Sequence, residues 1–226
     1  MEWKDSNITL PLPKRNELTS LIEQNGVRME VPAKKVFLKP GDTLNGVYYI
    51  AEGRTRHFMC APDGAEKLLY TLSAGWFYGE TPCVLHDSTG LFSKTEKPSV
   101  LYLIPMQNYD RLLAESSLFR KAILQSYSQK MRILRQEIAN LSFTPCKDRL
   151  RRYCSTADTS RVIDGQWYDL KLNYTQYEIS TIVGGARVTI TKLINELCAE
   201  GFIRVLNRKT QINIEQYKQE IEKDWA

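Results

Sequence analysis

One predicted helix carries a group of outward-facing side chains, two of them cationic, close to its start. The stretch EISTIVGGARVTITKLINEL has a helical stripe of apolar residues on each side of Gly184-Gly185. Glycine is a poor helix former and tolerates left-handed backbone, so the pair predicts a tight turn between two helices. Burial of the second stripe (Ile190, Leu193, Ile194, Leu197) leaves these residues facing outwards: Arg187, Val188, Thr191 and Lys192.

Two helices joined by a short glycine turn predict a helix-turn-helix, whose second helix can reach base edges in the DNA major groove. Arg187 could bind a guanine or a phosphate, and the methyl groups of Val188 suit a thymine methyl group, which favours AT-rich half-sites. The following segment, GFIRVLNRKTQINI, predicts a two-stranded wing with Arg208 and Lys209 at its tip. Two alternatives stay open: many helical hairpins are purely structural, and Val188 could simply pack.

Composition limits the other possibilities. The 226 residues carry a net charge of +5, and residues 143–209 hold eleven Lys and Arg against seven Asp and Glu. This excess favours a polyanionic partner, although an ordinary solvated surface explains it as well. No apolar run is long enough for a membrane span, and the N-terminus lacks the apolar core of a signal peptide. The scattered cysteines indicate a reducing cytoplasm as the expected location. Five scattered cysteines and two histidines predict no zinc site, and no catalytic motif indicates an enzyme.

Three segments must position these residues. From about Met29 to Ile104, short runs rich in Val, Tyr, Phe and Leu alternate with turn signals, and Gly53 and Gly75 recur at predicted strand ends. This pattern predicts a β-barrel or sandwich. The expected domains are 1–107 for the β domain, 108–143 for a central helix and 144–226 for the helix-turn-helix domain.

The central helix carries a possible dimer seam. Residues 108–141 contain no Pro or Gly, Ser116-Ser117 suits a helix start, and Thr144-Pro145 a helix end. Six residues follow one another at steps of three or four, near the coiled-coil period: Ile123, Tyr127, Lys130, Leu134, Ile138 and Leu141. They predict a homodimer, although the stripe could pack on the β domain of its own chain instead.

The order of β domain, long helix and winged helix-turn-helix resembles the CRP–FNR family of bacterial transcription regulators, from about Met29 to Ile214. YEISTIVGGARVTITKLINEL is similar to the DNA-binding helices of that family, and KPGDTLNGVYYIAEG and LSAGWFYGE are similar to its β-roll. The resemblance implies an α+β fold: an N-terminal β-roll like a cyclic-nucleotide-binding jelly roll, a central dimerisation helix and a C-terminal winged helix-turn-helix. It also implies a homodimer that binds a palindromic operator on double-stranded DNA and contacts RNA polymerase. Carried over by residue, base contacts fall on Arg187, Val188 and Lys192, and phosphate contacts on Thr175 and Thr189.

The resemblance also bears on cofactors and effectors. In the cyclic-nucleotide branch, a phosphate-binding arginine follows a Gly-Glu pair. Gly79 and Glu80 are present, but Asp87 stands where the arginine is expected. A carboxylate would repel a cyclic phosphate, so binding of cAMP is not expected. The cysteine cluster of the oxygen-sensing branch is missing, which disfavours an iron–sulfur cluster, and a haem role for His57 or His86 is not expected either.

The stretch DGAEKLLY is very similar to that of the halorespiration regulators, which sense chlorinated aromatic acids. Tyr70 matches an effector contact of that branch. Tyr127 and Lys130 match its tyrosine and lysine that reach the effector from the partner subunit, which implies that Lys130 holds a phenolate or carboxylate. Lys130 could instead extend to solvent or pair with a carboxylate across the dimer. Glu80, where that branch has a lysine, and the loop 81–90 depart from it. The full predicted effector site is Tyr70, Gly79, Glu80, Thr81, Ser88, Thr89, Tyr127 and Lys130.

Two other functions remain as alternatives. A sensor of the same fold could take another effector, such as a cyclic nucleotide, or carry a helix-turn-helix that does not bind DNA. A cupin-type enzyme would need clustered His and carboxylate metal ligands, and two isolated histidines do not provide them.

Overall fold

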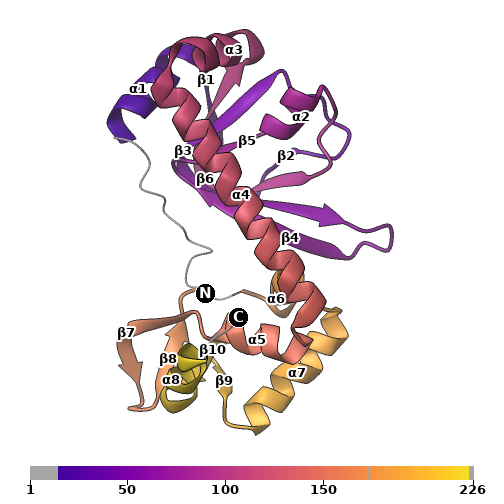
Figure 1. Cartoon of the computed structure of the whole chain (residues 1–226). Coiled ribbons are helices and arrows are strands. Elements are labelled where there is room, and N and C mark those ends of the chain that lie inside the picture. The colour runs from indigo at the N-terminus through magenta and orange to yellow at the C-terminus, as the bar shows by residue number, and fades with distance from the viewer. Residues whose placement is uncertain (1–14, 173, 224–226) are drawn as a thin grey trace. The chain divides into compact units, whose positions relative to one another are not determined.

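The computed structural model describes residues 15–172 and 174–223, and the chain divides into two compact units within one long helix, between Glu137 and Ile138. The first unit is an antiparallel β-roll with helices, and the second is a winged helix-turn-helix (Figure 1). This is the α+β architecture that the sequence predicts. The N-terminal stretch considered for a signal peptide lies outside the described residues.

The β-roll is one antiparallel sheet of six strands. They are β1 (Val27–Val31), β2 (Val36–Leu38), β3 (Gly46–Cys60), β4 (Glu66–Ser73), β5 (Phe77–Tyr78) and β6 (Phe92–Pro105). The long strand β6 pairs with β1, β2 and β3, and β3 also pairs with β4 and β5. Buried residues such as Tyr49, Ile50, Leu101 and Ile104 form the core of this unit.

Gly53 lies inside β3 and not at a strand end, which corrects the sequence-based expectation. Its φ is +95°, and the pairing of β3 with β6 shifts register on both sides of it. A Cβ at this position would lie 2.1 Å from Oγ of Ser99, so only glycine fits where the two strands approach. Gly75, also with positive φ, lies in the turn between β4 and β5 as predicted.

The predicted central segment contains two helices instead of one. α3 (Met106–Glu115) ends at Ser116, whose extended backbone separates it from α4 (Ser117–Phe143). Oγ of Ser116 accepts a hydrogen bond from Phe119 N at 3.2 Å, so the predicted start signal at Ser116-Ser117 is confirmed as the start of α4. The β-roll unit also contains α1 (Arg15–Asn25) and α2 (Glu80–Leu85), which the sequence pattern did not reveal.

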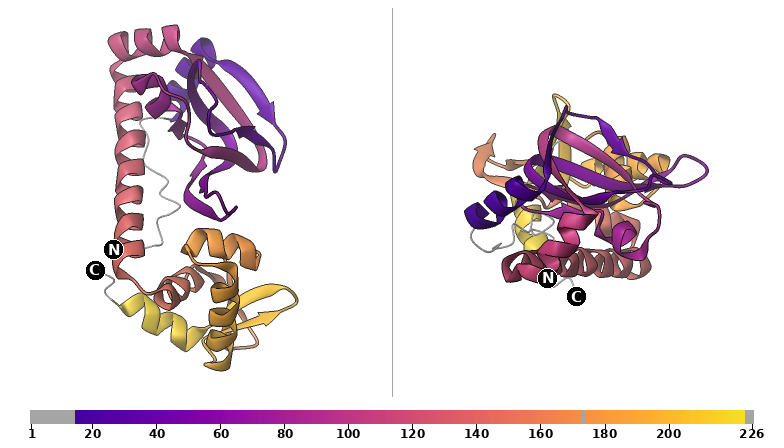
Figure 2. Two further views of the ribbon diagram at one scale, coloured as in Figure 1. Left: turned by 90° about the vertical axis from the view of Figure 1, so that its right-hand side faces the viewer. Right: turned by 90° about the horizontal axis from the view of Figure 1, so that it is seen from above.

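The first turns of α4 pack along one side of the β-roll, as Figure 2 shows. Phe119 and Ile123 are buried in the β-roll core, and Oγ of Ser126 accepts from Phe77 N at 3.3 Å. Lys130 faces the same way and is 7% exposed. The predicted seam was therefore wrong at Ile123 and Lys130.

A different apolar stripe runs along α4, one residue away from the predicted stripe at two positions. Its members are exposed except for the half-buried Leu134, and they follow at alternating steps of three and four: Leu124, Tyr127, Met131, Leu134, Ile138 and Leu141. This is an unbroken heptad pattern of the kind that pairs helices in a coiled coil.

The second unit has a four-stranded antiparallel sheet and helices. Its elements are α5 (Cys146–Cys154), β7 (Ala157–Ile163), β8 (Trp167–Leu170), α6 (Gln176–Val183), α7 (Arg187–Ala199), β9 (Ile203–Leu206), β10 (Lys209–Asn213) and α8 (Ile214–Glu222). The predicted wing corresponds to β9 and β10, while β7, β8 and α8 are additional. Its core contains Leu150, Ile190, Leu197, Phe202 and Ile212, so the predicted apolar face of α7 is buried.

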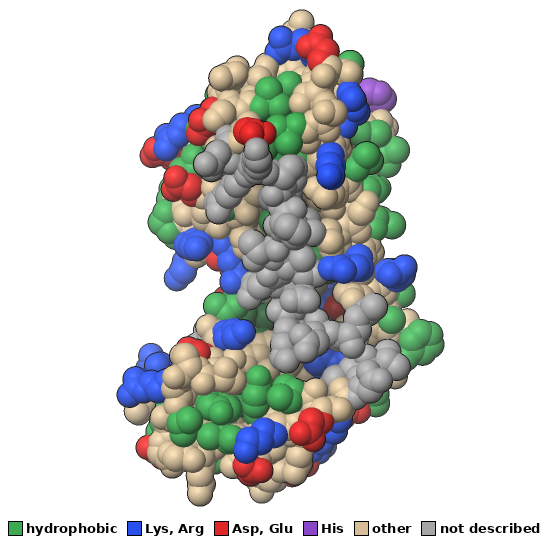
Figure 3. Space-filling model, turned by 60° about the vertical axis from the view of Figure 1, so that its left-hand side comes forward, with side chains coloured by type: hydrophobic (Ala, Val, Ile, Leu, Met, Phe, Trp, Pro, Cys, Tyr) green, Lys and Arg blue, Asp and Glu red, His purple; other side chains and the backbone are tan. Residues whose placement is uncertain are grey.

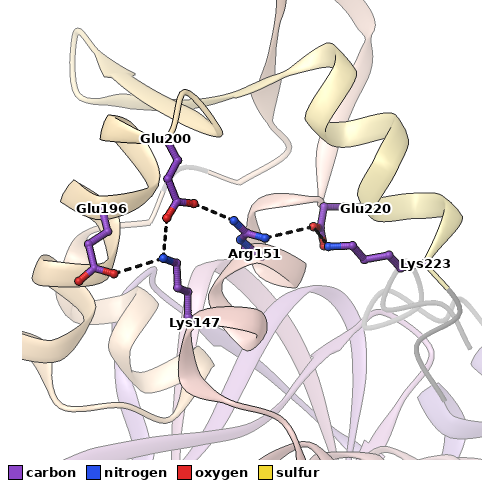
Figure 4. Close-up of polar contacts among 6 residues, drawn as sticks. All are labelled: Lys147, Arg151, Glu196, Glu200, Glu220 and Lys223. Carbon is purple, nitrogen blue, oxygen red and sulfur yellow. Dashed lines mark hydrogen bonds and ion pairs between the residues drawn. The ribbon is translucent and has the colours of Figure 1, made fainter.

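A chain of ion pairs ties α5 to α7 and α8 (Figure 4). Lys147 Nζ lies 2.6 Å from Glu200 and 3.3 Å from Glu196, and Arg151 lies 2.7 Å from Glu200. On the other side Arg151 approaches Glu220, which also pairs with Lys223. Because cationic and anionic side chains alternate in this series of contacts, it connects α5 with the C-terminal end of α7 and with α8.

The charge of the chain does not gather in one place on the face that Figure 3 shows: Lys and Arg side chains are scattered among Asp and Glu. Net charge therefore locates no binding site on that face. Within the described residues, no helix is both long and apolar enough to cross a membrane.

Candidate DNA interface and effector cavity

A complete capping box starts α6. Thr175 Oγ1 accepts from Glu178 N at 3.2 Å, and Glu178 Oε2 accepts from Thr175 N at 2.9 Å. These reciprocal bonds satisfy two of the N–H groups that a helix start leaves open. Thr175, a predicted phosphate contact, is thereby fixed at an exposed helix start.

The two glycines of the turn are needed for different reasons, one for its backbone conformation and one for close packing. Gly184 has a φ of +71° and ends α6 in the left-handed conformation, as predicted. A Cβ on Gly185 would lie 2.8 Å from Sγ of Cys146 and 3.2 Å from Cδ1 of Ile190, so this glycine allows close packing. Together they let α7 start immediately after α6.

Arg149, on α5, holds this turn in place. Its Nε donates to Val183 O at 2.8 Å and its Nη2 to Gly184 O at 2.9 Å, while Nη1 donates to Thr144 O at 2.6 Å. The last carbonyls of a helix have no partner within it and carry the negative end of the helix dipole, so a guanidinium suits them. Sequence reasoning missed Arg149, because nothing in KDRLRR distinguishes it from its neighbours.

The start of α7 presents the predicted base-contacting residues to solvent. Arg187, Val188, Thr189 and Lys192 are exposed, and Val188 is 82% exposed. Val188 therefore does not pack in the core, which removes that alternative. An arginine, an apolar methyl pair and a lysine on one helical face form a surface that can contact base edges and phosphates.

The start of α7 has two further features: its first N–H groups have no side-chain cap, and Thr191 contacts α6. The N-cap residue Ala186 offers its helix no side-chain hydrogen bond, so the first N–H groups of α7 remain available to an anion such as phosphate. Thr191 is half-buried, and its hydroxyl lies 2.9 Å from Oε1 of Gln176 on α6. Thr191 therefore braces the two helices, in addition to the contact role predicted for it.

Asn207 and Arg208 form the turn of the wing, and their φ values are +50° and +62°. Two consecutive positive φ values belong to tight hairpins, in which the second residue is usually glycine. Here the second residue is an exposed arginine. Lys209 is also exposed, with its Nζ 3.6 Å from Asp169. The predicted tip residues thus project two cationic groups, one of them near a carboxylate.

The β-roll unit contains a cavity of about 470 Å³. It is lined by all eight residues predicted for the effector site, which come from β4, α2 and its N-cap, the loop after α2, and α4: Tyr70, Gly79, Glu80, Thr81, Ser88, Thr89, Tyr127 and Lys130. Its volume lies within the usual range for small-molecule sites. Sequence reasoning missed Tyr78 in this wall, and His57 was considered only for haem.

Lys130 is not free in this cavity. Its Nζ lies 2.6 Å from both carboxylate oxygens of Glu80 and donates to Phe77 O at 3.0 Å. The pair is buried, with side-chain exposures of 9% for Lys130 and 5% for Glu80. Burial lowers the pKa of Lys130, and the attraction of Glu80 opposes this shift. One alternative predicted that Lys130 pairs with a carboxylate across the dimer. Lys130 does pair with a carboxylate, but Glu80 belongs to the same chain.

Three aromatic rings form the inner wall. The His57 ring lies 5.2 Å from the Tyr70 ring and 4.9 Å from the Tyr78 ring. Both ring nitrogens of His57 are engaged at 2.9 Å, by the hydroxyls of Thr55 and Ser93. Burial, together with the charge of Lys130, lowers the pKa of His57 to about 3, so the ring is neutral at physiological pH.

In the described part of the chain, no cluster of three His, Cys, Asp or Glu side chains could hold a metal ion.

Family models match both units in order: a cyclic nucleotide-binding domain at residues 28–116 and a Crp-like helix-turn-helix domain at residues 149–219. The chain belongs to the CRP–FNR family of transcription regulators. A CRP-like cAMP-activated global transcriptional regulator of Mycobacterium tuberculosis is 25% identical over 179 residues, which is 77% of each chain.

Solved structures show the same fold at low identity. The c-di-GMP responsive regulator CLP of Xanthomonas campestris has a TM-score of 0.77 at 18% identity, covering 87% of this chain and 98% of its own. CprK in complex with OCPA has a TM-score of 0.66 at 18% identity, covering 87% and 90%. As a CRP–FNR member, this chain is a DNA-binding, effector-dependent regulator, and its cavity lies in the unit that carries the cyclic-nucleotide-binding fold.

Proposed function

We propose that this chain binds a palindromic, AT-rich operator as a homodimer and that a small aromatic effector in the β-roll cavity controls this binding. The observation that carries the DNA-binding part is the start of α7. Arg187, Val188 and Lys192 stand exposed there, beside N–H groups without a side-chain cap. In a two-fold dimer, the two copies of α7 would read half-sites about 34 Å apart.

A binding-site selection from random double-stranded DNA, at a fixed salt concentration, tests this part. Arg187→Ala should weaken the selected site about 10- to 100-fold and affect random DNA much less. Arg161→Ala, on the exposed face of β7, is the matched control and should leave that ratio unchanged. If no sequence is enriched, the alternative of a helix-turn-helix that does not bind DNA is favoured instead.

The heptad stripe on α4 supports the homodimer. Its residues Leu124, Met131 and Ile138 are 65%, 53% and 65% exposed, a large apolar stripe for a surface helix. Met131→Glu should shift the sedimentation of the full chain from dimer to monomer. Lys121→Glu, an exposed change on the same helix, should not.

The effector belongs to the cavity, whose walls are mainly aromatic and apolar. The resemblance to halorespiration regulators favours a halogenated aromatic anion held by Lys130. Such an anion would have to displace Glu80, since Lys130 is already bound to that carboxylate. A cyclic nucleotide is disfavoured further by Asp87, a carboxylate in the same wall.

The effector would act by binding one arrangement of the dimer more tightly than another, and so change the affinity for the operator. Tyr127 and Lys130 are the proposed coupling residues, because they lie on α4 and also line the cavity. RNA polymerase is the expected partner at the promoter, and the proposed setting is the cytoplasm. The role is regulation and not catalysis. Lys130→Ala should abolish the effect of the effector on DNA binding, and an unchanged response would remove Lys130 from this role.

A further inference from the structure

We propose that Arg149 and Arg152 of α5 are positioning residues for DNA recognition. They connect the end of α4 to the turn that precedes α7, and so fix the direction in which α7 meets a half-site. The inference rests on the proposed function, in which the start of α7 reads the operator, and it specifies how that helix is held. It stands on the hydrogen bonds of both guanidinium groups and on the packing of the turn against α5.

Arg152 holds the last turn of α4. It is 9% exposed, and its Nη1 donates to Oδ1 of Asn140, which is 7% exposed. Asn140 lies in the last turn of α4, on the other side of the Thr144-Pro145 break from α5. A hydrogen bond from a charged donor is one of the stronger kinds, and breaking it here would cost a buried guanidinium this partner. The end of α4 is therefore fixed to α5.

Arg149 contacts the linker and the helix-turn-helix at once. Its Nη1 donates at 2.6 Å to the carbonyl of Thr144, in the linker between α4 and α5. Its Nε and Nη2 donate to Val183 O at 2.8 Å and to Gly184 O at 2.9 Å, at the end of α6. The guanidinium is planar and its N–H groups point in fixed directions, so one rigid group sets the distance between the linker and the turn.

The position of the turn determines where α7 starts. Only two residues separate Gly184 from Arg187, the first residue of α7. A Cβ on Gly185 would lie 2.8 Å from Sγ of Cys146, the first residue of α5, so α5 also packs directly against the turn. Contacts to base edges depend on hydrogen-bond distances and angles, so a displaced turn would move Arg187 out of reach of its base.

The break at Thr144-Pro145 is bridged and does not act as a free joint. Thr144 N donates to Asn140 O at 3.0 Å, and Arg149 N donates to Pro145 O at 3.0 Å, so helical hydrogen bonds continue up to the break on both sides. The two arginine side chains then cross it. The compact DNA-binding unit accordingly includes α4 from Ile138 onwards, and a movement of this end of α4 carries the helix-turn-helix with it.

Dissociation constants of the full chain test this, measured at one salt concentration for the selected operator and for random duplex of the same length. Arg149→Met and Arg152→Met should each lower the preference for the operator about tenfold or more, the usual effect of one lost base contact, and change random-duplex binding less. Arg151→Met is the matched control. It removes the same charge from α5, but its partners are Glu200, at the far end of α7, and Glu220 on α8, so the preference should stay unchanged.

The spacing of the half-sites gives a readout that a loss of stability alone does not move. Changing the operator spacer by one base pair displaces the half-sites along and around the duplex. The parent chain should lose about tenfold or more in affinity, and Arg149→Met about threefold or less, because its α7 is no longer fixed relative to α4. Arg149→Lys keeps the charge but cannot contact three carbonyls in one plane, and should behave as Arg149→Met. Asn140→Ala, which leaves the turn contacts of Arg149 in place, should show the same tolerance of spacer length. All variants are compared at a temperature where circular dichroism shows them folded.

An operator preference and a spacer dependence equal to those of the parent chain in both Arg149→Met and Arg152→Met would overturn the inference, as would losses of the same size in Arg151→Met. If the parent chain prefers no DNA sequence, the proposed function fails and this inference fails with it. If the parent chain selects an operator and the arginine variants match it, only the positioning role is wrong.

Discussion

Replacing both members of the Glu80–Lys130 pair should cost much less stability than replacing either one. Each side chain is at least nine-tenths buried, and Nζ of Lys130 contacts both carboxylate oxygens at 2.6 Å. Lys130→Met leaves a buried carboxylate and Glu80→Leu leaves a buried ammonium, and each should lower the free energy of unfolding of the β-roll by about 3–5 kcal/mol. The double variant removes both charges and should lie within about 1 kcal/mol of the parent protein.

Trp76 makes this measurable, because it is 5% exposed within the β-roll core. In a background with Trp3, Trp167 and Trp225 changed to Phe, its fluorescence in urea reports the unfolding of this unit alone. The four proteins then give a double-mutant cycle with a coupling free energy of several kcal/mol. If the double variant loses as much as the two single variants added together, the two groups do not interact and the ion pair assigned to the cavity wall is wrong.

Three further variants test other features. Burial lowers the pKa of His57 from 6.5 to about 3, so the unfolded chain takes up a proton before the folded chain does as pH falls. Stability that is present above pH 6.5 is therefore lost below it, at about 1.4 kcal/mol per pH unit. His57→Gln should reduce the change in melting temperature between pH 7 and 5. Arg149→Met should lower the free energy of unfolding of the winged-helix unit by about 2 kcal/mol, read from Trp167 fluorescence, because two carbonyls at the end of α6 lose their donor. Gly185→Ala should cost that unit about 1–3 kcal/mol through the clash with Cys146, and adding Cys146→Ala should recover most of the loss.

Matched controls exist for these changes. His86→Gln, at an exposed histidine, is the matched substitution for His57→Gln, and Arg161→Met, at an exposed arginine, should leave the winged-helix unit as stable as before. A His57→Gln profile as steep as the parent profile, an Arg149→Met protein of parent stability, or a Gly185→Ala loss that Cys146→Ala does not reduce would each contradict the corresponding contact.

Local patterns predicted much of the DNA-binding unit, because helix caps and stripes are set by residues three or four positions apart. The break at Gly184, the buried face of α7 and the exposed Val188 follow from such spacing. Two residues of the predicted seam, Ile123 and Lys130, are buried against the β-roll, since a stripe of period 3.5 does not say which side of the helix meets that unit.

Contacts between distant residues could not be predicted in this way. Glu80 and Lys130 are fifty positions apart, and their pairing depends on how α4 packs on β5 and α2. The carbonyl contacts of Arg149 likewise appear only when the chain is folded. The resemblance named the cavity residues, and the ion pair among them came from the structure.

The wing turn has a consequence for how this protein tolerates mutation. Arg208 holds a φ of +62°, a conformation that costs a non-glycine residue about 1 kcal/mol. In a saturation library, Arg208→Gly should therefore be enriched when variants are sorted by resistance to proteolysis. The same substitution should be depleted when they are sorted by operator occupancy. Opposite selection at one codon would mark the tip of the wing as a place where the chain gives up stability for contact with DNA.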